Sequence, residues 1–320
     1  MISLSNVVER LSRGLKRHPR TLLLWSDDAG GIKIDDEYLL VKVDGFAASR
    51  ALYPWCSYRD FGFKAISSAI SDVFTKGCKP YIYAVSIGVK PSSMEAVEEL
   101  TRGVEDAVQL YGGYIENMDT NVGNDTWIDV FVLATCRATP IPRTARPGDF
   151  IVLPKAIGLS YVAYREFEKG STPIYEEVQA FSCRPRACAE VVDLMERSRI
   201  CFRGSIDISD TVYEALEAIA KINSVGIYMD LDARRALNLT ALSYAYVEGV
   251  DPVDVFLKSS EELVPLLIVS NLYVQQALEE MRSLGLSPTV VGIVTESREI
   301  SWRGRVLQKT MWNYEKGRIL

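Results

Sequence analysis

Two aspartates lie three residues apart where a short apolar stretch becomes a helix-like pattern. In residues 204–220, GSIDISDTVYEALEAIA, two isoleucines alternate with polar residues, and apolar residues then recur every three or four positions. Ser209 and Asp210 could cap the helix, because their side-chain oxygens accept bonds from free backbone N–H groups. Asp207 has no such explanation, since an acid that points inward from a strand must be paired, protonated or bound to a cation.

Five further acids lie next to apolar or glycine-rich stretches: Asp27, Asp28, Asp44, Asp72 and Asp119. Each has a structural explanation of its own. Asp27 and Asp28 could form an Asx turn, and Asp44 could open a turn with the following glycine. Asp72 could cap a helix or pair with Lys76 one helical turn away, and Asp119 could reflect ordinary loop polarity. Their number favours a shared role, because desolvating several carboxylates is costly. Carboxylates from several chain segments suit Mg²⁺, which is often shared with phosphates. Since no GxxxxGK[ST] motif occurs, the pattern indicates an ATP enzyme without a P-loop.

Composition excludes several other functions. The chain has 320 residues and a net charge of −6, whereas nucleic-acid binding usually needs a basic surface. No apolar run reaches the roughly 20 residues that span a bilayer. His18 is the single histidine, so hydrolase triads are set aside. The six cysteines form no CxxC pair and are interpreted as scattered small hydrophobes of a reducing cytosol, which predicts a cytoplasmic protein without a zinc site.

The acids must be positioned by elements that alternate between helix and strand. The spacing of apolar residues predicts helices over 3–17, 60–75 and 93–112, strands over 21–25, 38–46, 81–89 and 127–138, and a polar loop around Asp119. The segment 139–149 contains three prolines and a Gly-Asp turn, which marks a domain boundary. Beyond it, helices and strands alternate again, and residues 288–307 read as a late strand pair. An α+β fold is expected, with domains at 1–140 and 141–320.

Seven motifs follow one another in a fixed order: SDDAGG, KVD, GFKAISSAISDVFTKGCKP, ENMDT, PRTARPGD, IDISDT and MWNYE. This series resembles the thiamine-monophosphate kinase family, in the superfamily of aminoimidazole ribonucleotide synthetase and selenophosphate synthetase. The long third motif is similar to the family pattern GxKALAxNLSDLAAMGAxP, and IDISDT is similar to IDISDG. The resemblance covers almost the whole chain and identifies it as a divergent member.

The resemblance implies a two-domain aminoimidazole-ribonucleotide-synthetase-like fold. The N-terminal domain would bind metal and ATP and pair in a homodimer through a shared β-barrel, and a C-terminal α/β domain would pack against it. The implied Mg²⁺ ligands are Asp27, Asp28, Asp44, Asp72, Asp119, Asp207 and Asp210. Implied nucleotide contacts are Met118, Asp119, Thr120, Arg143, Arg146 and Ser209. Implied contacts to the acceptor are Arg50, Glu261, Glu262, Trp312 and Tyr314.

The implied reaction transfers a phosphoryl group from ATP to thiamine monophosphate. No side chain is assigned as a base, because a phosphate monoester is already anionic and needs charge neutralisation and in-line positioning, which Mg²⁺ provides. The expected partners are a second copy of the chain and a small phosphate substrate, without nucleic acid or membrane.

Several motifs depart from the family pattern. The GGDT loop has lost both glycines to Asn117 and Met118, and the histidine expected near Arg50 is absent. Three readings therefore stay open. They are a divergent thiamine-monophosphate kinase, a related ATP-dependent enzyme with another small substrate, and an inactive homologue that serves in binding or assembly.

Overall fold

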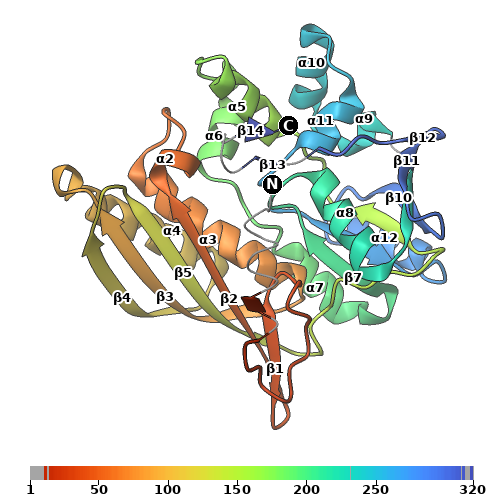
Figure 1. Ribbon diagram of the computed structural model, residues 1–320, viewed down its shortest axis with the longest axis horizontal. Coiled ribbons are helices and arrows are strands. Elements are labelled where there is room, and N and C mark those ends of the chain that lie inside the picture. Colours follow the sequence, from red (N-terminus) through yellow and green to blue (C-terminus); the bar gives the residue numbers. More distant parts are fainter. Residues whose placement is uncertain (1–10, 13, 231, 311, 314–317, 320) are drawn as a thin grey trace.

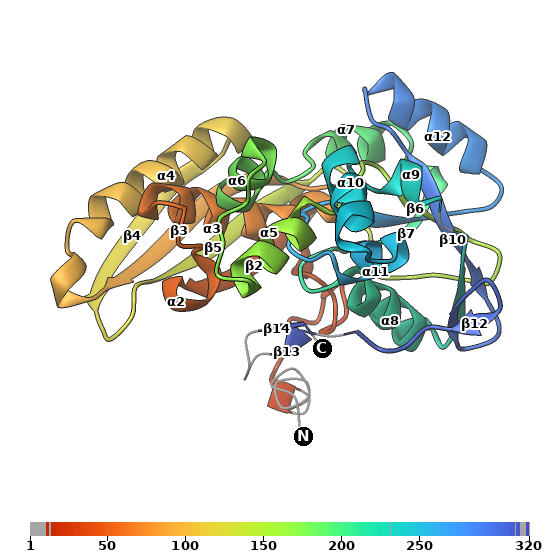
Figure 2. The same ribbon diagram turned by 90° about the horizontal axis from the view of Figure 1, so that it is seen from above.

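The computed structural model describes residues 11–12, 14–230, 232–310, 312–313 and 318–319. Two sheets, each packed with helices, lie side by side along the longest axis of the molecule (Figure 1). Figure 2 shows that helices α3 and α4 lie on one side of the first sheet. The architecture is the mixed α+β arrangement that the sequence predicts.

The first sheet has five strands in the order β1-β2-β5-β3-β4. Most neighbours are antiparallel, and β3 and β4 are parallel. The strands are β1 (Gly30–Ile34), β2 (Glu37–Ala47), β3 (Lys79–Val89), β4 (Tyr114–Val122) and β5 (Trp127–Cys136). In the described residues this sheet is open and does not close on itself, so one chain by itself forms no barrel.

Two long helices cover one face of this sheet, α3 (Tyr58–Thr75) and α4 (Ala96–Tyr111). They approach closely because each contributes a glycine at the contact. A Cβ atom on Gly62 would lie 2.2 Å from the Leu100 carbonyl oxygen, and one on Gly103 would lie 1.9 Å from the Arg59 carbonyl oxygen. A larger residue at either position would push the two helices apart.

The second sheet has seven strands in the order β12-β11-β8-β10-β6-β9-β7. These strands are β6 (Phe150–Leu153), β7 (Phe202–Asp207), β8 (Gly226–Met229), β9 (Pro265–Val269), β10 (Thr289–Thr295), β11 (Ile300–Trp302) and β12 (Arg305–Val306). A two-stranded pair, β13 (Trp312–Asn313) and β14 (Arg318–Ile319), follows. Short helices complete the fold: α2 (Ala48–Ala51), η1 (Pro91–Ser93), α5 (Leu159–Glu168), α6 (Glu176–Cys183), α7 (Glu190–Arg197), η2 (Arg199–Cys201), α8 (Val212–Asn223), α9 (Ala233–Ala236), α10 (Leu239–Glu248), α11 (Pro252–Lys258) and α12 (Val274–Ser283).

Strand β9 is apolar on both faces because both are buried. Leu266 and Ile268 join the core beneath α5, α8, α10 and α11, whereas Leu267 and Val269 join the core that also contains α3 and its sheet. Successive side chains of a strand point to opposite faces, so one strand contributes to both cores. One of the two cores thus contains side chains from both halves of the chain, and their division at 1–140 and 141–320 stays a prediction.

Most of the sequence-predicted elements are confirmed. Three expectations are wrong. Residues 21–25 form no strand, since Thr21 makes only an isolated bridge to Ile32. The segment around Asp119 is strand β4 instead of a loop. The late strands β10 and β11 do not pair with each other, because both pair with β8. The predicted helix 3–17 falls largely outside the described residues, and residues 14–17 are not helical.

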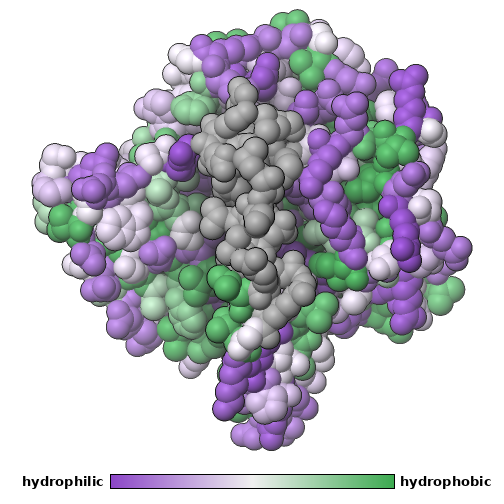
Figure 3. All heavy atoms as spheres, viewed as in Figure 1, coloured by the Kyte–Doolittle hydropathy of each residue, from purple (hydrophilic) through white to green (hydrophobic). Residues whose placement is uncertain are grey.

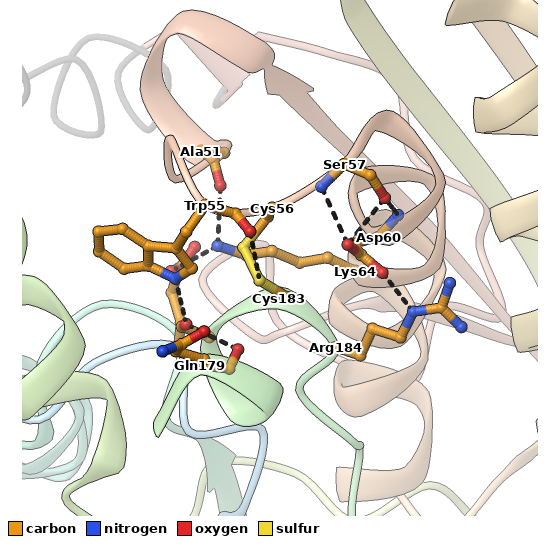
Figure 4. The surroundings of a disulfide bond; sticks show 11 residues. Ala51, Trp55, Cys56, Ser57, Asp60, Lys64, Gln179, Cys183 and Arg184 are labelled. Carbon is orange, nitrogen blue, oxygen red and sulfur yellow. Dashed lines mark hydrogen bonds and ion pairs between the residues drawn. A yellow bond between two sulfur atoms is a disulfide. The ribbon is translucent and has the colours of Figure 1, made fainter. Parts of the chain in front are cut away.

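The interpretation of the cysteines as unpaired hydrophobes is also wrong. Cys56 is bonded to Cys183 and Cys78 to Cys136, while the other two cysteines are free and buried. The paired residues are separated by 127 and 58 positions, so their proximity is created by the fold and leaves no local sequence signal. Cys56–Cys183 connects the segment before α3 to the end of α6 (Figure 4).

Among the residues that the structure describes, no helix combines the length and the apolar composition needed to cross a bilayer.

Candidate active site

A cavity of about 500 Å³ lies between the two sheets, where β2, α2, α3, α5 and the segments after β7 and α11 meet. It gathers predicted residues from distant parts of the chain: Asp44, Arg50, Asp72, Asp207, Ser209, Asp210 and Glu261. The sequence separation between the first and last is over 200 residues, so only the fold brings them together.

Helix α3 and strand β7 position Asp72 and Asp207, the two most buried acids of this cavity. Helix α3 starts at a capping box in which the Ser57 and Asp60 side chains each accept a bond from the other residue's backbone N–H. Three turns further on, Ser71 Oγ donates a hydrogen bond of 2.6 Å to Asp207 Oδ1. The second carboxylate oxygen, Asp207 Oδ2, is buried and has no hydrogen-bond partner.

Ser209 and Asp210, which follow β7, are not helix caps. The N-cap of α8 is Thr211, which forms a capping box with Glu214. Ser209 and Asp210 instead line the cavity. Helix capping, the structural role that the sequence suggested for Ser209 and Asp210, is therefore wrong.

The protein interior disfavours charge on the acids of this cavity. Burial raises the pKa of Asp207 well above its ordinary value, and the nearby Asp72 carboxylate adds to the effect. Burial likewise raises the pKa of Asp72 to about 7, although Lys42 opposes the shift. The pKa of Asp44 is also raised by burial. Carboxylates in such surroundings are stabilised in their charged form by an added cation.

Lys42 on β2 supplies part of that positive charge. Its Nζ lies 2.5 Å from Asp72 Oδ2 and 3.8 Å from Asp44 Oδ2. Although burial opposes it, these carboxylates raise the pKa of Lys42 and keep it protonated. Sequence reasoning missed Lys42, although a lysine that alternates with apolar strand residues two positions before an acid is a visible signal.

Asp27 and Asp28 form a separate ion network beside this cavity. Lys76 Nζ lies 2.6 Å from Asp27 Oδ1 and 2.6 Å from Asp28 Oδ2, and the Arg143 guanidinium pairs with Asp28. Burial alone would raise the pKa of Asp28, but Lys76 and Arg143 together hold it well below its ordinary value. Lys76 therefore pairs with these two acids, whereas the sequence offered it as a partner of Asp72.

Other residues assigned to the nucleotide lie elsewhere. Met118, Asp119 and Thr120 are exposed on β4, an edge strand, and do not line the cavity. Arg146 is exposed, and its backbone N–H donates to Asp149 Oδ2. In the described residues no group of three or more acidic, cysteine or histidine side chains is arranged closely enough to hold a metal by itself.

The residues assigned to the acceptor are divided between two cavities. Arg50 and Glu261 line the central cavity, and Glu261 Oε2 lies 2.8 Å from Lys64 Nζ. Glu262 accepts bonds from Gly158 N and Ser160 Oγ and borders a second cavity of about 670 Å³. Burial raises the pKa of Glu262 to about 7. The backbone of Trp312 belongs to β13, and Tyr314 lies outside the described residues.

Aromatic side chains that the sequence analysis did not single out form one wall of the central cavity. Tyr53, Tyr164 and Phe167 line it, and Tyr53 stacks on Trp55 with ring centroids 4.7 Å apart. The wall is fixed by the Cys56–Cys183 bond (Figure 4) and by a hydrogen bond from Trp55 Nε1 to Ser182 Oγ. The compact sequence YPWC at 53–56 is the signal that could have indicated it.

Comparison with known proteins agrees with the motif order. A family model described as AIR synthase related protein, N-terminal domain, matches residues 26–138. The thiamine-monophosphate kinase of Pyrobaculum calidifontis is 27% identical over 299 residues, covering 92% of this chain and 94% of the relative. The thiamine-monophosphate kinase of Pyrococcus abyssi is 26% identical and covers 81% of each chain.

Solved structures have the same fold. The crystal structure of tt0281 from Thermus thermophilus superimposes with a TM-score of 0.87 at 24% identity, covering 96% of this chain and 99% of the other. AaThiL complexed with AMPPCP and TMP gives a TM-score of 0.83 at 19% identity, covering 98% and 97%. The motif order, the match of residues 26–138 to the AIR synthase related N-terminal domain and relatives that align over most of their length agree, and this chain is similar to thiamine-monophosphate kinases along most of its sequence.

Proposed function

We propose that this protein is a kinase that transfers a phosphoryl group from ATP to thiamine monophosphate and forms thiamine diphosphate. The observation that supports it most directly is the central cavity, which brings together Asp44, Asp72, Asp207 and Asp210 from three chain segments. Relatives that match most of the chain are named thiamine-monophosphate kinases. A solved structure of the same fold carries AMPPCP and TMP.

These four acids fit Mg²⁺, the cation that the family implies, together with oxygen ligands from phosphate and water, because no three of them in the described part of the chain are close enough to hold an ion by themselves. Oxygen donors suit this hard ion, and the buried Asp207 Oδ2 atom lacks a hydrogen-bond partner. When bound, Mg²⁺ would neutralise charge on the phosphates of ATP. For Asp27, Asp28 and Asp119 the role of metal ligand stays a prediction from the sequence.

The protein's own side chains supply charge and orientation. Lys42, Arg50 and Lys64 place positive charge around the cavity, where an anionic phosphate acceptor would lie. Lys64 is held in place by the Ala51 carbonyl and Glu261. The acceptor needs no proton removed at neutral pH, so these side chains need only hold the reacting phosphates in line.

Ser209 lines the cavity and is proposed to contact the nucleotide. The corresponding assignments of Met118, Thr120, Arg143 and Arg146 stay predictions, as do those of Glu262, Trp312 and Tyr314 toward the acceptor.

We also propose that the protein is a cytoplasmic homodimer that pairs through the open face of the five-stranded sheet. Val41, Val43 and Phe131 are exposed there, and Val43 lies opposite Phe131 in the register of β2 and β5. Figure 3 shows apolar surface over this part of the molecule. A second copy would cover these side chains, and the two sheets together would build the shared barrel.

One observation favours the inactive homologue instead. Asp44 and Asp72 pair with Lys42, and Asp27 and Asp28 pair with Lys76 and Arg143, so four of the seven expected ligands already have cationic partners. An inactive protein would retain these ion pairs for stability alone.

An assay of the purified chain tests the proposal. The chain is incubated with ATP, Mg²⁺ and thiamine monophosphate, and the formation of thiamine diphosphate is followed by chromatography. Product that requires both ATP and Mg²⁺ supports the kinase. Magnesium-dependent ATP binding without product indicates another acceptor. Absence of both product and nucleotide binding supports the inactive homologue.

A further inference from the structure

Lys76 is a fully buried lysine at the end of α3. It is the C-cap of that helix, and its side chain has no exposed surface. A buried ammonium group is costly unless its charge is compensated and its N–H groups are bonded.

Lys76 Nζ makes two ion pairs and one hydrogen bond. Nζ lies 2.6 Å from Asp27 Oδ1, 2.6 Å from Asp28 Oδ2 and 3.0 Å from the Ser205 carbonyl oxygen. An ammonium group has three donors and no acceptor. The two ion pairs compensate the charge of Lys76, and together with the hydrogen bond to Ser205 they connect the turn before β1 to strand β7.

Arg143 completes the compensation of charge. Its guanidinium pairs with Asp28, and its backbone N–H donates a bond of 3.1 Å to Asp27 Oδ2. Two carboxylates thus face two cationic side chains. The site carries no net negative charge that would attract a divalent ion.

We propose that Lys76 is a resident cation that takes the place of a divalent metal ion between Asp27 and Asp28. The aspartates of the motif series are then of two kinds. Asp27 and Asp28 are neutralised by the protein and hold the structure together, whereas the acids of the central cavity bind metal. The metal-binding role of the cavity acids rests on the proposed function, whereas the structural role of Asp27 and Asp28 does not.

The family pattern quoted above has methionine where this chain has Lys76, so Lys76→Met removes the charge and keeps an unbranched side chain. The first test measures thermal unfolding of the full chain without nucleotide, in EDTA and in millimolar Mg²⁺. Mg²⁺ is expected to shift the Tm of the wild type by the same amount as that of Asp27→Asn, because any shift then comes from the acids of the central cavity. Lys76→Met is expected to have a lower Tm in EDTA, and Mg²⁺ is expected to restore part of the loss, because Asp27 and Asp28 are then without their lysine.

Lys79→Met is the matched control, since Lys79 lies three residues away, is exposed and forms surface ion pairs with Asp193 and Glu196. Its Tm should respond to Mg²⁺ as the wild-type Tm does. A wild-type Tm that Mg²⁺ raises in the absence of nucleotide, with the rise removed in Asp27→Asn, would overturn the proposal.

A second test counts Mn²⁺ ions by electron paramagnetic resonance with a non-hydrolysable ATP analogue, which keeps the proposal testable if Lys76→Met does not fold. Asp27→Asn is expected to bind as many ions as the wild type, and Asp207→Asn fewer. Loss of one ion in Asp27→Asn contradicts the role given to Lys76. If the wild type binds no Mn²⁺ with the analogue, the proposed kinase function fails, whereas the Tm comparison still decides the role of Lys76.

Discussion

Lys42 Nζ lies 2.5 Å from Asp72 Oδ2, so a lysine of β2 holds an acid of α3 at the wall of the central cavity. The pair connects strand β2 of the first sheet to helix α3, which covers that sheet. It places a fixed positive charge where the proposed function needs the charges of ATP to be neutralised.

Replacing Lys42 should change the requirement for magnesium. Lys42→Met removes a cation that competes for Asp72 and Asp44, so divalent binding should become about threefold to tenfold tighter, which corresponds to about 1 kcal/mol. Calorimetric titration of Mg²⁺ in the presence of an ATP analogue measures this affinity. Lys42→Arg, which keeps the charge, is the control, and weaker Mg²⁺ binding in Lys42→Met would show that Lys42 assists the metal site.

Removing one proposed ligand should abolish turnover without unfolding the chain. Asp72→Asn and Asp210→Asn keep the size of the side chain and remove its charge, so each should lower kcat by about a hundredfold or more if these acids hold the catalytic metal. Steady-state rates with circular dichroism as the folding control provide the check. Unchanged rates in both variants would falsify the metal role of the cavity.

Glu262 should make stability depend on pH. Its pKa is raised from the ordinary 4.5 to about 7, so the folded state binds a proton more tightly than the unfolded state. The resulting stability is present below pH 4.5 and is lost as the pH rises toward 7, by about 3 kcal/mol in all. Glu262→Gln can still accept the bonds from Gly158 and Ser160, and it should remove this loss. Urea unfolding of both proteins at a series of pH values tests it, and parallel curves would contradict the assignment.

The Cys56–Cys183 bond should stabilise the fold. It closes a long loop, with the two residues 127 positions apart, and a bond of this kind typically contributes about 2–4 kcal/mol to the free energy of unfolding. Cys56→Ser should therefore unfold at a lower denaturant concentration than the wild type under non-reducing conditions. With reductant present the difference between the two proteins should disappear. Thiol titration of the denatured wild type should find two free thiols, from Cys188 and Cys201, and six would exclude both bonds.

A charge on the open face of the first sheet should prevent dimer formation. Val43 is 67% exposed and lies opposite Phe131, at the centre of the surface that a second copy would cover. Val43→Glu should sediment as a monomer, because a carboxylate buried without a partner is costly. Lys33→Glu, on β1 at the margin of the same sheet, is the control and should leave the dimer intact. A wild-type chain that sediments as a monomer would contradict the proposed pairing.

The sequence by itself determined the elements with strong local signals and the identity of the acids. Helix α3 has a capping box and apolar residues that recur every three or four positions, and strand β5 alternates clearly between buried and more exposed residues, so the positions of these elements follow from neighbouring residues. Asp44, Asp72, Asp207 and Asp210 stood out because acids beside apolar residues are costly to desolvate, and the cavity brings these four together.

Only the tertiary structure decided which charges face each other. Lys42, Lys76 and Arg143 each meet an acid that is distant in sequence or on another element, and the nearer pairing of Asp72 with Lys76 does not form. The same holds for Cys56 and Cys183. Contacts between distant residues depend on how the two sheets pack around α3, and no periodicity or spacing along the chain encodes that packing.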